Sequence, residues 1–311
     1  MWLSYLKMSR PVNLLIMVVT MVLAKLFVVQ PVFDLYRQEN GLSWLQFALM
    51  VVATLLIAAA GYWLNDQQDV EADRINKPGK NLVGIVFSGQ KVMKGALWLT
   101  LLGVILGNGL SIWLGAYRLG FFYTVPAILL WLYNAKLKHW PIVGNITVSV
   151  LVGMVPMLPG LHEMAMLNEA DVMGAALFGY IAKGSVAYGV LAFGINLIRE
   201  LVKDIEDMQG DDQIGSHTLP LVIGERQAKF IAIILCLVLI RIVLIAQQAY
   251  LKDGELTLPV YLAVAVQLPL LVGMVMLFFA NDNRAYTRVS LLMKLIAAAG
   301  VGSMILYNIA L

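Results

Sequence analysis

Two clusters of acidic residues in this chain of 311 residues share one spacing. Each has aspartates at positions i, i+3 and i+7, which are Asp66, Asp69 and Asp73 in the first cluster and Asp204, Asp207 and Asp211 in the second. At about 100° per residue, these positions fall within an arc of about 60° on an α-helix. The spacing therefore predicts that the three carboxylates of each cluster share one helical face.

Carboxylates gathered in this way need a cation near them. Like charges at this spacing repel one another, and acidic side chains at the ends of apolar segments are costly. Mg²⁺ prefers oxygen ligands and is commonly held by one or two carboxylates together with substrate phosphates. Two facing clusters thus predict a site for Mg²⁺ and one diphosphate, with all six aspartates as metal ligands and catalytic residues. The alternative is two solvated helix ends whose acids pair with nearby lysines, which accounts less well for two clusters of identical spacing.

A bound diphosphate also needs cations apart from the metal ions. Basic residues follow the first cluster and the fourth apolar segment, and these are Arg74, Lys77, Lys80, Lys136 and Lys138. The general excess of basic residues on the cytoplasmic side of membrane proteins explains most of them equally well. The histidines have no metal-ligand spacing, and we expect them at the surface or in loops: His139, His162 and His217.

The segments that must position these residues are long and apolar. Hydrophobic residues make up 60% of the chain and charged residues 13%, with a mean hydropathy of +0.81. Soluble domains are about half apolar and a quarter charged, so this composition predicts a membrane protein. A helical span needs about 20 apolar residues. An all-α bundle of nine transmembrane helices is therefore predicted, at 12–30, 43–63, 93–114, 117–134, 142–161, 172–196, 228–250, 257–280 and 289–310.

The two longest polar connections, 64–92 and 197–227, hold the acidic clusters. Most basic residues of the connections lie on the same side as these two and the N-terminus. Since basic residues concentrate in cytoplasmic connections, we predict that the N-terminus and both clusters face the cytoplasm. The repeated spacing also suggests one domain, 1–311, built of two related halves, about 1–140 and 141–311.

Both motifs resemble those of a known family. The segment NDQQDVEAD (65–73) resembles the NDxxDxxxD signature of the UbiA superfamily of intramembrane prenyltransferases, and KDIEDMQGD (203–211) resembles its second acidic motif. The segments RPVNLLIM (10–17) and GSHTLPLVIG (215–224) are similar to the family at corresponding places, so the resemblance covers the whole chain. It implies nine helices around a central cavity open to lipid, with a cytoplasmic cap over Mg²⁺ and a prenyl diphosphate.

The resemblance also implies roles for individual residues. By motif position, Asn65 joins the first three aspartates as a metal ligand, and Lys138 and Arg10 contact the diphosphate. The segment RINKPGKNLVG (74–84) departs from the frequent Arg-Pro-x-x-x-G pattern, which leaves Lys77 and Lys80 to take the role of that arginine.

A closer resemblance, to one branch of the family, narrows the choice of acceptor substrate. The segments DRINKPGKN (73–81) and RELVKDIEDMQGD (199–211) resemble the digeranylgeranylglyceryl phosphate synthase branch. This implies transfer from geranylgeranyl diphosphate to geranylgeranylglyceryl phosphate, for whose phosphate Arg199, Lys203 and Lys94 are candidate cations. An aromatic acceptor, as in quinone-type biosynthesis, stays open. A cation-coupled transporter is the alternative of another class, although transporters more often place single acids near the bilayer midplane. No nucleic-acid partner is expected.

Overall fold

Long apolar helices make up almost the whole protein in the computed structural model, which describes residues 2–38, 41–76, 79, 81–167 and 171–307. Within these residues, eight helical segments are long and apolar enough to cross a membrane. They are Pro11–Leu35 (α2, η1 and α3), Trp44–Gln68 (α4), Gly89–Trp113 (α6), Val143–Met164 (α8), Val172–Glu206 (α9), Glu225–Lys252 (α12), Thr257–Phe279 (α13, η4 and α14) and Asn283–Tyr307 (α15 and α16). The chain is an integral, multi-pass, all-α membrane protein.

The predicted count of nine spans is not confirmed. The segment expected at 117–134 forms a 3₁₀ turn, Tyr117–Gly120 (η2), followed by the helix α7, Phe121–Ala135. Fifteen residues extend about 22 Å, which is shorter than the roughly 30 Å of the hydrocarbon core. Helix α7 ends at Ala135, and the polar connection that follows it places Lys138 in the interior of the bundle.

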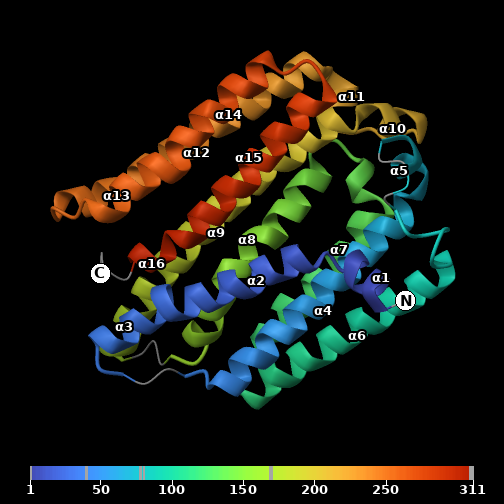
Figure 1. Ribbon diagram of the computed structural model, residues 1–311. Coiled ribbons are helices and arrows are strands. Elements are labelled where there is room, and N and C mark those ends of the chain that lie inside the picture. Colours follow the sequence, from blue (N-terminus) through green and yellow to red (C-terminus); the bar gives the residue numbers. More distant parts are fainter. Residues whose placement is uncertain (1, 39–40, 77–78, 80, 168–170, 308–311) are drawn as a thin grey trace.

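Short helices lie at both ends of the bundle (Figure 1). The helices α1 (Trp2–Met8), α5 (Val70–Asn76) and α10 (Met208–Gln213) lie at one end, and α3 (Gln30–Leu35), α13 (Thr257–Leu262) and α16 (Met304–Tyr307) lie at the other. Helix α9 has 35 residues and extends about 52 Å, so that it exceeds the hydrocarbon core. Its C-terminal turns can therefore reach the polar region beyond the lipid chains.

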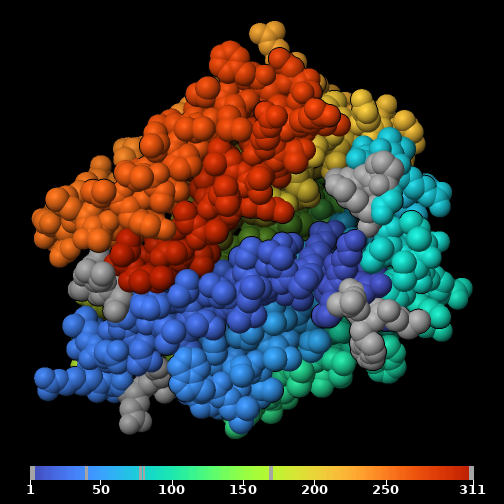
Figure 2. Space-filling view, in the orientation of Figure 1, coloured from blue at the N-terminus to red at the C-terminus, as the bar shows by residue number. Residues whose placement is uncertain are grey.

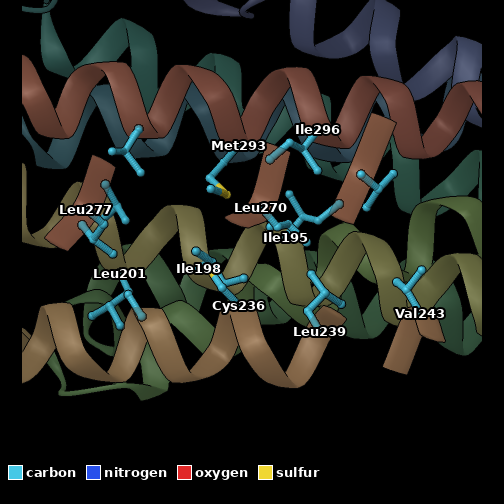
Figure 3. Close-up of a cluster of buried hydrophobic side chains, with 14 of the residues drawn as sticks. Ile195, Ile198, Leu201, Cys236, Leu239, Val243, Leu270, Leu277, Met293 and Ile296 are labelled. Atoms are coloured by element: carbon cyan, nitrogen blue, oxygen red, sulfur yellow. The ribbon is translucent and has the colours of Figure 1, made fainter. Parts of the chain in front are cut away.

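The largest apolar core joins α9, α12, α14 (Leu268–Phe279) and α15 (Asn283–Gly302). Figure 3 shows its side chains interleaving between the four helices: Ile195, Ile198, Leu201, Cys236, Leu239, Val243, Leu270, Leu277, Met293 and Ile296. Lipid chains are as apolar as these residues, so close packing rather than water exclusion holds such helices together. This core fixes α9 and α15, which both line the cavity described below.

A buried ion pair holds the opposite end of the bundle together. Lys25 lies in the π-helical segment Ala24–Val29 (η1), and its Nζ is 3.2 Å from Oε1 of Glu163 on α8. The two side chains are 2% and 1% exposed. Oε2 of Glu163 accepts hydrogen bonds from the backbone N–H groups of Gly41 and Leu42, at 2.8 and 3.2 Å. One carboxylate thus ties the first span (Pro11–Leu35) and the connection after it to α8.

Glu163→Gln is expected to destabilise the protein by about 3 kcal/mol or more, because Lys25 would be left as an uncompensated buried charge. The measurement is the unfolding midpoint in detergent under increasing denaturant. Adding Lys25→Met to this variant removes the stranded charge and should recover part of the loss. An unfolding curve of Glu163→Gln that overlays the wild type would show that the pair contributes nothing to stability.

Candidate active site

The two aspartate motifs end two long helices in the same way. Helix α4 ends at Gln68 and α5 begins at Val70, with Asp69 between them. Helix α9 ends at Glu206 and α10 begins at Met208, with Asp207 between them. The prediction of one continuous helical face is therefore wrong, because each helix is interrupted at its middle aspartate. The third aspartate still stays close, since Asp73 N–H donates to the Asp69 carbonyl at 2.7 Å and Asp211 N–H to the Asp207 carbonyl at 3.2 Å.

Both motifs line one cavity of about 830 Å³, as predicted from their spacing. The motif residues on its wall are Asn65, Asp66, Asp69, Asp73, Asp204, Asp207 and Asp211. Its basic lining residues are Lys7, Arg10, Lys138, Arg199, Lys203 and Lys294. Along α4 and α9 the lining changes from these polar residues to apolar ones such as Ile57 and Leu191. The cavity therefore has a polar, acidic mouth and an apolar interior.

Basic side chains already contact the first motif. An Nη atom of Arg10 is 2.9 Å from Oδ1 of Asp66, and its guanidinium lies 4.8 Å from the ring centroid of Tyr62. Lys138 Nζ forms an ion pair with Oδ1 of Asp69, and only 8% of its side chain is exposed. Arg10 and Lys138 are far apart in the sequence, and both contact the first motif.

Asparagine side chains hold the acidic segments in place. Asn81 donates to the Asp66 carbonyl at 2.7 Å and to Oδ2 of Asp73 at 2.9 Å. Asn145 of α8 donates to Oδ2 of Asp204 at 2.8 Å. Each carboxylate oxygen can accept more than one bond, so these amide groups do not by themselves saturate the carboxylates.

Asn76 joins the two motifs directly. Its Nδ2 donates to the Asp207 carbonyl at 3.0 Å, and its Oδ1 accepts from the Gly210 N–H at 3.0 Å. A Cβ on Gly210 would lie 2.4 Å from Asn76 Nδ2, so only glycine admits this approach. Asn76 therefore sets the separation between the two acidic segments.

Lys138 is also fixed through its neighbours. His139 Nδ1 lies 2.7 Å from Ser216 Oγ, and the His139 carbonyl accepts from the His217 N–H at 3.1 Å. Burial, and then the positive charge of Lys138, lower the pKa of His139 below its usual value. The connection that carries Lys138 to the first motif is thus anchored to the segment that follows the second.

The other predicted cations are placed differently. Arg74 is exposed on α5 and does not line the cavity. Lys77 and Lys80 lie outside the described residues. Lys203 lines the cavity and is 3.3 Å from Oε2 of Glu200. Lys94 is exposed on α6, away from the cavity wall, so it is no candidate for contact with a substrate in this cavity.

The prediction that all three histidines lie at the surface or in loops is wrong for His162. This residue is fully buried in α8, and its Nε2 lies 2.8 Å from the hydroxyl of Tyr123, a cavity-lining residue. The polar ring is tolerated inside because its Nδ1 also has a partner, the Leu158 carbonyl at 2.9 Å.

Several site residues were missed by sequence reasoning: Asn76, Asn81, Asn145 and Lys294. Asparagines are common in loops and at helix ends, so a single one carries no signal by itself. In the sequence Lys294 cannot be told from the other basic residues that gather on one side of the apolar segments. An asparagine near each acidic cluster was the one available hint, because carboxylates in a poorly solvated mouth need hydrogen-bond donors.

The donor set fits a hard divalent cation that is shared with a substrate. Six carboxylates and the amide of Asn65 face one space, which is the oxygen-rich chemistry that Mg²⁺ prefers. Among the described residues, no three His, Cys, Asp or Glu side chains come together closely enough to hold a metal ion by themselves. Protein ligands in this arrangement would have to be completed by phosphate oxygens and water, as is usual for Mg²⁺.

Asn76→Ala is expected to lower kcat/KM about tenfold, because removing two hydrogen bonds costs roughly 1–3 kcal/mol of the contact between α5 and α10. The Mg²⁺ concentration for half-maximal activity should rise, while the unfolding midpoint changes little. Glu71→Ala, on an exposed position of α5, is the matched control and should behave as wild type. Equal Mg²⁺ dependence in Asn76→Ala and wild type would contradict the positioning role.

The sequence matches a known family over most of its length. A model of the UbiA prenyltransferase family matches residues 32–298. A digeranylgeranylglyceryl phosphate synthase from Thermococcus gammatolerans is 31% identical over 250 residues, covering 79% of this chain and 80% of the relative. The corresponding protein from Pyrococcus furiosus is 36% identical over 176 residues, which are 57% of this chain and 56% of the relative's length.

Solved structures share the architecture. A structure of digeranylgeranylglyceryl phosphate synthase superposes with a TM-score of 0.70 at 22% identity, over 99% of this chain and 98% of that one. A UbiA homolog from Archaeoglobus fulgidus bound to DMAPP and Mg²⁺ gives a TM-score of 0.59 at 14% identity, over 96% and 98%. At these identities the likeness shows a common fold.

Proposed function

The chain belongs to the UbiA prenyltransferase family, and from this premise we propose that this membrane prenyltransferase joins geranylgeranyl diphosphate to geranylgeranylglyceryl phosphate. The names of the relatives support this donor and this acceptor. The observation that carries the proposal is the cavity itself, because two aspartate motifs meet at its mouth and apolar residues line its interior. Such a cavity suits an amphiphile with an anionic head and a long hydrocarbon tail.

The proposed metal ligands are Asn65, Asp66, Asp69, Asp73, Asp204, Asp207 and Asp211. Mg²⁺ held by these residues would neutralise negative charge on the diphosphate. The solved homolog with DMAPP and Mg²⁺ supports the same metal for this chain. Lys138 and Arg10 lie at the first motif, where they can stabilise the diphosphate as it leaves.

The proposed reaction breaks the allylic C–O bond, and the bond's electron pair leaves with the diphosphate. A new ether bond forms between the allylic carbon and the free glycerol hydroxyl, whose proton passes to a carboxylate of the cavity. Tyr62, Tyr133 and Tyr188 line the cavity and can stabilise an allylic cation through their ring faces. The apolar interior keeps water away from the reacting carbon.

We further propose that the N-terminus and the cavity mouth face the cytoplasm. The distribution of basic residues supports this orientation. Labelling of single cysteines introduced at exposed positions of α5 and of the connection 253–256, in intact cells and in lysed cells, tests it. Protection of the α5 cysteine in intact cells only is the expected result.

The experiment that tests the function is an acceptor panel. Purified protein in detergent receives Mg²⁺, labelled geranylgeranyl diphosphate and either geranylgeranylglyceryl phosphate or a hydroxybenzoate-type acid. We expect labelled ether lipid from the first acceptor, its loss with EDTA and its return with added Mg²⁺. If the aromatic acid is prenylated and the glyceryl lipid is not, the protein belongs with the prenyltransferases that use aromatic acceptors.

A further inference from the structure

One wall of the cavity mouth carries three basic side chains in addition to Arg10 and Lys138. Arg199 and Lys203 lie about one turn apart on α9, and Lys294 lies on α15, which packs against α9. All three line the cavity, and Lys294 lies within the electrostatic influence of Arg199, Lys203 and Arg10 and of the acid Glu200. The three side chains therefore form one electropositive corner, on the helices that carry the second motif and its neighbour.

Two acids face this corner and leave it incompletely neutralised. Glu200 accepts from an Nη atom of Arg199 at 2.6 Å and lies 3.3 Å from Lys203 Nζ. Asp204 also acts on this corner, but it is a residue of the second motif and is held by Asn145. Lys294 forms no hydrogen bond or ion pair with any residue that the structure describes. Buried Arg199 Nε likewise has no partner there.

An apolar stripe leads away from Lys294 along the same face of α15. The cavity-lining residues that follow are Ala297, Ala298, Gly300 and Val301 of α15 and Met304 at the start of α16. From Lys294 to Val301 the helix α15 rises about 10 Å, and α16 continues the wall beyond it. A cation followed by an apolar wall of this length suits a phosphate head followed by a long hydrocarbon chain.

The stripe also borders a way in from the membrane. Figure 2 shows a furrow between α15 (red) and α2 (blue), with the green of α8 visible at its bottom. Ile16 and Met17 of α2 line the cavity opposite α15, and Ile16 is 43% exposed. A lipid that moves sideways through this furrow would therefore meet Lys294 with its head group.

We propose that Arg199, Lys203 and Lys294 bind the phosphate of the acceptor lipid, whose hydrocarbon chain lies along α15. The inference rests on the proposed function and adds a binding site for the acceptor phosphate, on α9 and α15, to the proposed diphosphate site at Arg10 and Lys138. The site would favour an acceptor lipid with a phosphate group over an uncharged one, because an uncharged lipid would leave the cations of this corner without an anion.

Lys294→Gln tests the proposal, because Lys294 is exposed and unpaired and its replacement should not disturb folding. A hydrogen bond to a charged group contributes about 1.5–3 kcal/mol, so KM for geranylgeranylglyceryl phosphate should rise roughly tenfold or more. KM for geranylgeranyl diphosphate should stay the same. The preference for this acceptor over dephosphorylated geranylgeranylglycerol should fall, and Lys294→Arg should restore it.

Arg288→Gln is the matched control, since Arg288 is exposed on the same helix and does not line the cavity. An unchanged acceptor KM in Lys294→Gln would overturn the inference, as would a rise in donor KM alone. A defect seen in phosphatidylglycerol vesicles but not in detergent would assign the corner to bilayer head groups and also overturn it. Failure of the proposed function looks different, because the wild type itself would then prenylate no glyceryl phosphate.

Discussion

Replacing Asp69 or Asp207 by alanine is expected to abolish prenyl transfer, with a loss of at least about a thousandfold in kcat. Each aspartate stands at the interruption between a long helix and the short helix that follows, where its carboxylate faces the shared cavity. Electrostatic groups aimed at developing charge in a poorly solvated site commonly contribute about a hundred- to a thousandfold each, and a lost metal ligand adds to this. The measurement is single-turnover formation of labelled ether lipid at saturating Mg²⁺.

Asp212→Ala provides the control, because Asp212 is exposed beside the second motif and is no lining residue. A second readout separates binding from folding. Mg²⁺ together with geranylgeranyl diphosphate should raise the melting temperature of the wild type, since a ligand that binds only the folded state stabilises it. The two cavity variants should melt like the ligand-free wild type and show little or no increase. Full turnover in either variant would remove the proposed metal site.

Lys138→Met should reduce kcat/KM by about a hundredfold. The side chain is almost completely buried at the mouth and pairs with Asp69. Methionine keeps most of the side-chain volume but removes the cation, so negative charge on the departing diphosphate loses its stabilisation. Because that charge grows as the C–O bond breaks, the larger part of the loss should appear in kcat rather than in KM for the donor. Steady-state kinetics with varied geranylgeranyl diphosphate would measure both.

Lys136→Met is the control for this variant, since Lys136 lies two residues earlier, is exposed and does not line the cavity. The general excess of basic residues in such connections explains both lysines equally well; the family resemblance singles out Lys138, and the fold places it, unlike Lys136, in the cavity wall. If the two variants lost activity to the same small extent, Lys138 would have no role beyond that bias.

The membrane-embedded, all-helical nature of the chain follows from its sequence because hydropathy is a local property. Twenty consecutive apolar residues form a helix in lipid wherever they occur, since each backbone polar group must be satisfied within the segment. The aspartate spacing is local as well, so the two acidic motifs and their common chemistry were predicted from a few residues each. The path of the backbone through the motifs could not be predicted in this way, because the helices are interrupted at Asp69 and Asp207, where the chain turns over the cavity.

Which side chains meet inside the bundle was decided by the tertiary structure alone. Lipid and protein interior are equally apolar, so a membrane helix carries no polar stripe that shows which face turns inward. The rotation of α15 that brings Lys294 to the cavity is therefore set by packing against α9. The position of α7, from whose end Lys138 approaches Asp69, is likewise set by packing against its neighbours α4, α6 and α8. The bond from Asn76 to the Asp207 carbonyl joins residues 131 positions apart, a distance over which no sequence spacing carries information.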